Sequence, residues 1–280
     1  MENYFVFLLI LFLIIFVSGC ISQEEKVSSN VGLSAALTSD AKKIAASSPV
    51  TFILTVKNLA SEPARDISVE LTNLTGWNVE NKMQSLPKLV TNDLYKFSWL
   101  AYSPATGNKS FLATANVFYK MDSKAMLKVR VYNNDYLNTL NQEEREKIKS
   151  KSALLSSSIS SNTPLKISIS LQQPFILAQS SQNFPFVINI KNAGLGKVYS
   201  SYSTYPPAPR DEEYFVFSYS SNSTLQCDFA NNEAVKLVNG SKSIACKISA
   251  SGIEKYSDFS INFTLSYSYF DKVKREIEVA

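Results

Sequence analysis

The stretch Thr51-Phe-Ile-Leu-Thr-Val-Lys-Asn58 returns 134 residues later as Pro185-Phe-Val-Ile-Asn-Ile-Lys-Asn192. In both copies apolar side chains recur at every second position, which is typical of a β-strand that buries one face. Each copy is followed by small residues, Leu59-Ala60 in the first and Ala193-Gly194 in the second, and then by another strand. This repetition predicts one β-sheet unit that the chain uses twice.

Other alternating segments surround the two copies, with turn residues between them at about the 8–12-residue spacing of a β-sandwich. They lie at 67–71, 127–131, 165–169, 261–265 and 273–279. We also expect both units to end alike, in an aromatic strand, a polar turn and a final strand. These endings are 115–119 with 124–131, and 265–270 with 272–279. The pattern predicts an all-β protein.

The strand pattern breaks between residues 133 and 163. Asn141-Gln-Glu-Glu144 has the form of a capping box, in which the first residue caps a helix and the Glu bonds back to it. The segment that follows, 143–151, is rich in charge. We predict a short helix there and a Ser-rich linker over 156–163.

The order strand, Lys-Asn, small residues and strand, with Leu74-Thr-Gly-Trp77 after the next strand of the first unit, resembles the CARDB and NEW3 families. These are immunoglobulin-like modules common in archaeal and bacterial surface proteins. The resemblance implies two immunoglobulin-like β-sandwich domains, at 31–132 and 164–280, joined by a helical and Ser-rich linker at 133–163. Because such modules carry many functions, the resemblance predicts the fold and leaves the function open.

The chain begins with an unbroken apolar run over residues 4–17, followed by Val17-Ser-Gly-Cys20. This pattern predicts an export signal at 1–20 and a tether at 21–30. It resembles the lipobox of prokaryotic lipoproteins, which implies a lipidated Cys20 as mature N-terminus and membrane anchor. Two alternatives stay open, an uncleaved anchor helix and simple secretion, because Met1-Glu-Asn3 lacks the usual positive charge. All three place the protein on the extracytoplasmic side.

Cysteine usage fits an exported protein, because a lipidated Cys20 would leave one pair, Cys227 and Cys246. We expect these two to form a disulfide that closes a β-hairpin, with arms at 234–238 and 244–248 around an Asn239-Gly240 turn. Two buried free thiols are the alternative. Five Asn-x-Ser/Thr motifs are candidate glycosylation sites. They are Asn73, Asn108, Asn222, Asn239 and Asn262.

Composition argues against several function classes. The net charge is only +4 and the Lys and Arg residues are spread along the chain, so we do not expect nucleic acid as a partner. The chain has no histidine, so a Ser-His-Asp or Cys-His arrangement cannot be built. We therefore expect no enzyme activity, no cofactor and no metal. Asp211-Glu-Glu213 reads as solvated charge, with a loop calcium site as the alternative.

A Tyr/Ser segment at 199–210 runs into a proline-rich stretch and has the composition of a binding loop. Its candidate contact residues for a ligand or partner are Tyr202, Tyr205 and Arg210. An edge strand with outward tyrosines is the alternative. We expect Trp77 and Trp99 in the core, with a ligand-stacking role as the alternative.

The sequence thus predicts a cell-surface lipoprotein whose non-catalytic immunoglobulin-like domains serve adhesion or assembly with other envelope proteins. The alternative is a glycan- or solute-binding accessory lipoprotein, which would need a concave aromatic site near Tyr202 or Trp77. The expected partners are the membrane, through the N-terminal lipid or anchor helix, and envelope proteins or surface glycans.

Overall fold

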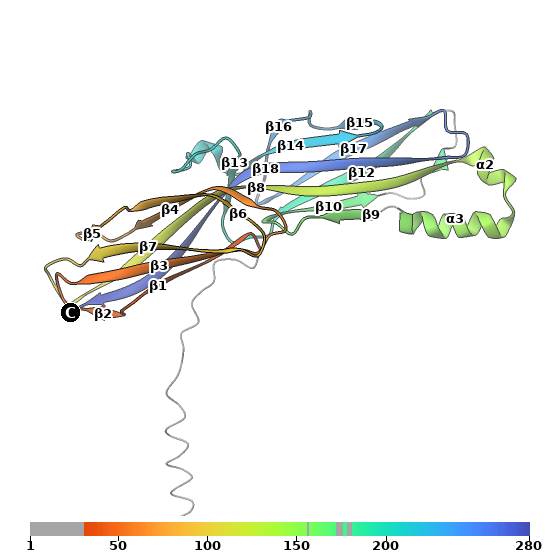
Figure 1. Ribbon diagram of the computed structural model, residues 1–280. Coiled ribbons are helices and arrows are strands. Elements are labelled where there is room, and N and C mark those ends of the chain that lie inside the picture. Colours follow the sequence, from red (N-terminus) through yellow and green to blue (C-terminus); the bar gives the residue numbers. More distant parts are fainter. Residues whose placement is uncertain (1–30, 156, 172–175, 178–180) are drawn as a thin grey trace, which may run out of the picture.

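The computed structural model describes residues 31–155, 157–171, 176–177 and 181–280. The predicted signal, the tether and Cys20 lie outside the described residues. Most described residues belong to antiparallel β-sheets, so the all-β prediction is confirmed at that level. Figure 1 shows an elongated molecule with two lobes arranged end to end, and two helices at the far end of the second lobe.

Lobe 1 contains the strands that come first in the chain. They are β1 (Leu33–Ser39), β2 (Lys43–Ile44), β3 (Pro49–Asn58), β4 (Ala64–Thr72), β5 (Asn78–Val79), β6 (Met83–Leu89) and β7 (Leu94–Tyr102). Lobe 2 contains the later short strands. They are β9 (Ser157–Ser160), β10 (Leu165–Leu171), β11 (Ile176–Leu177), β12 (Ser181–Asn192), β13 (Lys197–Ser200), β14 (Tyr214–Ser221), β15 (Thr224–Cys227), β16 (Glu233–Lys236) and β17 (Ser241–Ser251).

Two long strands, β8 (Lys109–Asn133) and β18 (Tyr256–Val279), run through both lobes (Figure 1). They pair antiparallel without a break, from Lys109 opposite Val279 to Tyr132 opposite Tyr256. They form the middle of a ten-stranded sheet that both lobes share. Each lobe also has a small four-stranded sheet of its own, with order β1-β3-β7-β5 in lobe 1 and β10-β12-β17-β15 in lobe 2.

This arrangement corrects the predicted ending of each unit. The turns expected near residues 120–123 and at residue 271 do not form, because β8 and β18 continue straight through both positions. Lobe 1 receives its last strand from the C-terminus of the chain, and lobe 2 receives its last strand from the second half of β8. The two halves of the chain therefore exchange their final strands.

Both small sheets cover the same face of the shared sheet. Side chains on a strand alternate between two faces, and most odd-numbered residues of β8 are buried along its whole length. The odd-numbered residues of β18 follow the same pattern over most of the strand. The hydrophobic core therefore lies between the shared sheet and the two small sheets. Trp99 and Trp77 are buried in lobe 1, as expected.

The repeated Lys-Asn motif has the same structure in both lobes. The Asn58 Oδ1 accepts the Ala60 N–H at 2.9 Å, and its Nδ2 donates to the Glu62 carbonyl at 2.9 Å. The Asn192 Oδ1 accepts the Gly194 N–H at 3.1 Å, and its Nδ2 donates to the Gly196 carbonyl at 3.0 Å. Each Asn thus holds the bend that carries the chain from one sheet to the other, which explains why the motif is repeated.

The lobes meet at a waist rich in buried tyrosines. The Leu33 N–H, at the start of β1, donates to the Tyr119 hydroxyl at 3.3 Å. The Leu165 N–H, at the start of β10, donates to the Tyr267 hydroxyl at 3.3 Å. Tyr267 also contacts the Ser123 hydroxyl at 3.1 Å. Burial raises the pKa of Tyr267 to about 12 and raises that of Tyr119 well above its ordinary value.

The predicted helix is present as α3 (Gln142–Leu155), after a short α2 (Asn134–Thr139). The capping box is confirmed, because the Glu144 N–H donates to the Asn141 Oδ1 at 2.8 Å and the Asn141 N–H donates to the Glu144 Oε2 at 3.4 Å. Part of the expected linker is instead a strand, since β9 pairs with β8. Along the described ranges no helix is long and apolar enough to cross a membrane.

The expected disulfide hairpin is only partly right. Cys227 and Cys246 are bonded, and Asn239 and Gly240 have the positive φ angles of a type I′ turn. The two arms, however, separate into different sheets, because β16 pairs with β14 while β17 pairs with β12 and β15. The disulfide therefore joins two neighbouring strands of the small sheet, β15 and β17.

Candidate functional site

The outer face of the shared sheet carries charges of both signs in matched pairs. Arg65 bonds to Asp122 at 2.7 Å in the middle of the molecule. Further ion pairs follow the sheet on both sides of this one. They are Lys120 with Asp66, Lys124 with Glu62, and Arg130 with Asp258. Lys128, Lys272, Lys274, Glu276 and Glu278 are exposed on the same face. Because positive and negative charges are mixed across it, this face favours neither an anionic nor a cationic partner.

The small sheet of lobe 2 has a different outer face. Its strands β10, β12, β15 and β17 contain no Asp or Glu. We call the outward side of this sheet the lysine face, because Lys166, Lys191 and Lys247 are exposed on it among Ser, Asn, Thr and Gln side chains. Lys166 and Lys191 stand directly opposite each other on neighbouring strands. The face is flat, polar and positively charged.

Hydrogen bonds between side chains cross the lysine face from strand to strand. The Asn189 Nδ2 donates to the Ser170 Oγ at 3.2 Å, and the Ser243 Oγ donates to the Asn189 Oδ1 at 2.8 Å. The Ser249 Oγ donates to the Asn183 Oδ1 at 2.7 Å. The polar groups are thus largely satisfied within the sheet, which leaves the lysines as the groups able to attract a partner.

The small sheet of lobe 1 carries apolar side chains on the equivalent face. Leu100 and Tyr102 are each 37% exposed on β7. On the neighbouring strand β3, Thr51 stands opposite Leu100 and Pro49 opposite Tyr102, with Ile53 one step further along the same face. We call Pro49, Ile53, Leu100 and Tyr102 the apolar patch. Lys57 and Lys96 are exposed at the other end of this face, so lobe 1 presents apolar and basic groups, whereas lobe 2 presents polar and basic ones.

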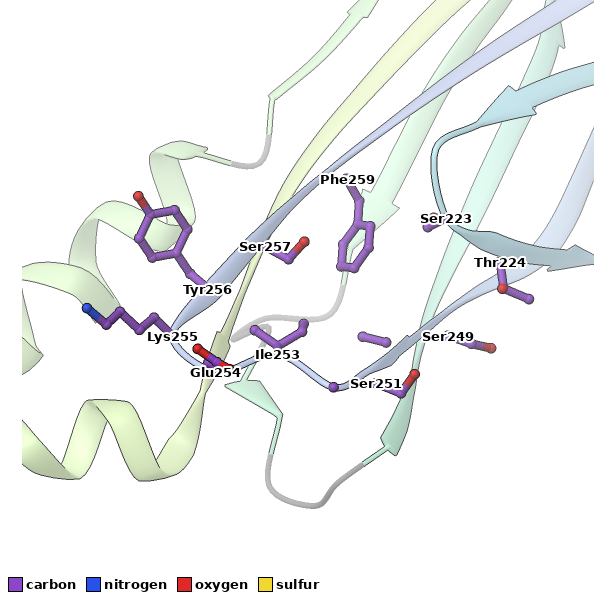
Figure 2. Close-up of a pocket in the computed structure, with 12 residues that line it drawn as sticks. Ser223, Thr224, Ser249, Ser251, Ile253, Glu254, Lys255, Tyr256, Ser257 and Phe259 are labelled. Carbon is purple, nitrogen blue, oxygen red and sulfur yellow. The ribbon is translucent and has the colours of Figure 1, made fainter.

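A polar cleft of about 610 Å³ opens at the far end of lobe 2, beside the turn between β17 and β18. Its lining is rich in hydroxyl groups, including Ser223, Thr224, Ser249 and Ser251. Figure 2 shows the Phe259 ring lying between its own strand and these serine-bearing segments, whereas Tyr256 and Lys255 point away from them. Such a mixture of hydroxyls with one ring suits a polar ligand that has one apolar face.

Next to the cleft, an ordered stack of side chains stabilises the end of β8 and β18. Arg130 makes two bonds to Asp258, Nε to Oδ1 at 2.6 Å and Nη2 to Oδ2 at 2.7 Å. The same guanidinium lies over the Tyr256 ring, 4.5 Å from its centre. The hydrogen bond to Arg130 lowers the pKa of Asp258, and the bond to Asp258 raises that of Arg130. Both groups therefore stay charged at neutral pH.

The proposed binding loop divides into exposed and engaged residues. Tyr202 is 78% exposed and the Arg210 side chain 90% exposed. Tyr205 instead packs on the outer face of the waist, near the Phe118 and Phe270 rings. Its hydroxyl donates to Glu70 and accepts from Asn116. Burial, together with the Glu70 hydrogen bond, raises its pKa to about 12. Tyr202 and Arg210 are therefore the more exposed of the three predicted contact residues, and partner contact at all three stays a prediction.

The acidic segment at the end of this loop is used inside the protein. The Ser203 Oγ donates to Asp211 at 2.7 Å, and the Lys197 Nζ donates to Glu212 at 2.6 Å. Among the residues whose positions are described, no group of three or more His, Cys, Asp or Glu could hold a metal ion.

All five sequon asparagines are exposed, but their side chains differ in engagement. The Asn222 Nδ2 donates to the Asp258 carbonyl at 3.2 Å, while its Oδ1 accepts the Ser260 N–H at 2.8 Å. The Asn73 Nδ2 donates to the Thr114 hydroxyl at 3.0 Å. Asn239 projects from the type I′ turn. Glycosylation stays a prediction, and the turn at Asn239 is its best-presented site.

Neither a known protein family nor a curated protein matches the chain. Distantly similar solved structures include the secreted serine protease VesC from Vibrio cholerae, at 8% identity and TM-score 0.25, covering 88% of this chain and 51% of that one. Another is the CupB6 tip adhesin from Pseudomonas aeruginosa, at 10% identity and TM-score 0.15, covering 87% and 88%. The chain spans about half the length of VesC. At such low identities and TM-scores, these similarities carry no argument about fold or function.

Proposed function

We propose that this protein is a non-catalytic recognition module of the cell envelope, used in adhesion or in assembly with other envelope proteins. The unbroken β8–β18 ladder is the observation that carries the proposal. A bend at the waist would have to break ladder hydrogen bonds and expose buried tyrosines, so the two lobes act as one rigid rod. A rigid rod holds two binding surfaces at a fixed distance and orientation, so that a contact at one lobe positions the other lobe.

The extracytoplasmic location is supported by the Cys227–Cys246 disulfide, because such bonds persist mainly in oxidising compartments. Attachment to the membrane through a lipid on Cys20, or through an anchor helix, is part of the proposal. Its test is mass analysis of the mature N-terminus in wild type and in Cys20→Ser. A lipidated, processed N-terminus that is lost in the variant supports lipidation, and an unprocessed chain supports the anchor helix.

The apolar patch on lobe 1 is the proposed contact with an envelope protein. Exposed aliphatic and aromatic side chains beside a charge-poor strand are typical of the centre of a protein interface. Leu100 and Tyr102 have this character, and none of the strands in their sheet contains Asp or Glu. The patch lies on a rigid sheet, so little ordering is needed on association.

Site-specific photo-crosslinking in intact cells tests this contact. A photoreactive residue at Leu100 should give adducts of defined mass, because the patch is covered by a partner. The matched control is Leu112, an equally accessible leucine on the outer face of the shared sheet in the same lobe. Adducts at position 100 and none at 112 support the proposal. No adducts at 100, or the same adducts at both positions, contradict it.

Carbohydrate binding in the polar cleft is the second candidate, favoured by its hydroxyl-rich lining and the Phe259 ring. Sugars present hydroxyls at their edges and C–H groups on their faces, which match serine side chains and an aromatic ring. An array of envelope polysaccharides probed with wild type and Ser251→Arg tests this candidate. Binding that the rim substitution abolishes supports it, whereas equal binding by both proteins places the sugar elsewhere.

A further inference from the structure

We infer that the lysine face of lobe 2 lies against the anionic headgroups of the membrane, so that the rod is held along the membrane surface. This inference rests on the proposed membrane anchoring. It adds a second attachment, made by the folded protein itself, and it assigns a membrane-facing side to a molecule that would otherwise turn freely on its tether. Because both small sheets cover the same face of the shared sheet, the apolar patch then also faces the membrane, so the envelope protein that it contacts lies at the membrane surface.

The point of attachment is set by where the described chain begins. β1 starts at the waist, where the Leu33 N–H bonds to Tyr119, and β1 belongs to the small-sheet layer. Gly32 lies against Pro164, which immediately precedes β10 in the other small sheet, and a Cβ on Gly32 would be 2.5 Å from the Pro164 Cγ. The chain therefore enters the fold between the two small sheets, on the side of the shared sheet that they cover.

Chain length limits how the rod can stand. The predicted tether from residue 21 to residue 30 reaches at most about 35 Å when fully extended. β8 spans 25 residues, so the rod is about 80 Å long and each lobe extends about 40 Å from the waist. An upright rod therefore needs the tether to be almost fully stretched, which is entropically costly. A rod lying along the surface meets no such limit.

Charge selects the side that faces the lipid. The lysine face presents Lys166, Lys191 and Lys247 on strands without any carboxylate. Lys166 and Lys191 stand opposite each other across two strands, where like charges repel unless an anion lies between them. Exposed lysines near a surface of anionic lipids are attracted to it over about a Debye length. The outer face of the shared sheet, with its matched ion pairs, has no comparable attraction.

The experiment uses the full-length protein reconstituted in vesicles of phosphatidylcholine, with or without phosphatidylglycerol. Lysines are acetylated by a reagent that cannot cross membranes, and the rate at each site is read by mass spectrometry. Lys166, Lys191 and Lys247 should be labelled at least about threefold more slowly in the anionic vesicles, and salt at about 0.5 M should remove the difference. Lys128, Lys272 and Lys274, on the shared sheet, serve as internal controls and should be unchanged.

The outcomes separate this inference from the anchoring on which it rests. Failure of the protein to float with either kind of vesicle contradicts the anchoring. Flotation with both kinds, but equal labelling of the lysine face in both, overturns the docking of this face. Protection of the same lysines by soluble polyphosphate, without protection by anionic vesicles, also overturns it and assigns the face to an anionic polymer.

A pair of variants gives an independent check. Replacing Lys166, Lys191 and Lys247 with Gln should speed acetylation of Lys242, the remaining lysine of the same small sheet, in anionic vesicles, because the sheet no longer stays on the lipid. Replacing Lys128, Lys272 and Lys274 with Gln removes the same charge from the opposite side and should leave labelling of the lysine face protected. Equal behaviour of the two variants contradicts the inference.

Discussion

The two lobes share an interior plan and differ on their surfaces. Asn58 and Asn192 hold the same bend, and Tyr119 and Tyr267 each receive the N–H group that starts the first strand of a small sheet. The outward positions of those small sheets differ more: lobe 1 carries the apolar patch together with Lys57 and Lys96, whereas lobe 2 is rich in serine and lysine. The interior was constrained by packing and hydrogen bonding, whereas the outward positions were open to specialise.

The difference shows where function should be sought in this molecule. Side chains at inward positions are constrained by core packing and hydrogen bonding, so their similarity between the lobes carries no information about partners. Outward positions on equivalent strands take no part in the core and bond at most to one another across the sheet, so we interpret their divergence as a sign of what lies outside the protein. The lysine face and the apolar patch are therefore better guides to function than the repeated motif that revealed the lobes.

The largest effect should come from the shared bend. Asn58→Ala should lower the free energy of unfolding by about 4 kcal/mol, because the Ala60 N–H and the carbonyls of Glu62 and Leu89 lose their partner at a buried site. Asn192 is less buried, so Asn192→Ala should cost about 2 kcal/mol. Urea unfolding of both variants measures the difference. Asn262→Ala, an exposed control, should have a free energy of unfolding close to that of wild type. Equal losses for Asn58→Ala and Asn192→Ala would contradict the argument that the more buried Asn contributes more stability.

The disulfide belongs to lobe 2, and its removal should come next in size. Cys227→Ser with Cys246→Ser should lower stability by about 3 kcal/mol, because the closed loop of 19 residues no longer restricts the unfolded chain. Hydrogen exchange should accelerate more in β15 and β17 than in β3 and β7. Equal acceleration in both lobes would instead show that the shared ladder makes them unfold as a single unit.

The smallest effect concerns the waist, where the lobes meet. The folded pKa of Tyr267 and of Tyr205 is raised to about 12, above the ordinary value of 10.0. The stability that comes from keeping these hydroxyls neutral is complete below pH 10 and is lost as pH rises from 10 to about 12.

Urea unfolding between pH 9 and pH 11 should therefore show a falling midpoint. Tyr267→Phe should lower stability by about 1 to 2 kcal/mol at neutral pH, through the lost bonds to Leu165 and Ser123, and should flatten the alkaline decline. Tyr202→Phe, at an exposed position, should change neither the stability at neutral pH nor the alkaline decline. A decline as steep in Tyr267→Phe as in wild type would contradict the role given to this residue.

Local patterns predicted the local structure well. Period-two alternation placed the strand cores, the Asn141–Glu144 spacing placed the cap of α3, and cysteine arithmetic selected the bonded pair. The strand and cap predictions depend on residues close together in the sequence, and the cysteine pair follows once Cys20 is set aside for lipidation. The Lys-Ile-Ser-Ile-Ser order of 166–170 also held the signal for the lysine face, since its polar residues all fall on one side of a strand.

Which strands pair with each other could not be predicted from local patterns. Residues 120–123 and 271 were expected to turn, yet no Gly or Pro forces a turn there, and the chain continues to pair with a strand about 150 residues away. The arms beside Asn239-Gly240 were expected to pair with each other, but each has a better partner in a different sheet. Tyr205 was expected to be a contact residue and is engaged at the waist.

The sequence by itself determined that this is a mostly β protein with a repeated strand unit, a capped helix and one cysteine pair, because those features follow from side-chain periodicity and from contacts close in sequence. Only the tertiary structure decided that the final strands are exchanged, that the lobes form one rod, and which outward faces lie together. The physical reason is that a strand's hydrogen-bonding edges are chemically alike. Their partners are chosen by the packing of the whole chain, which no single stretch of sequence contains.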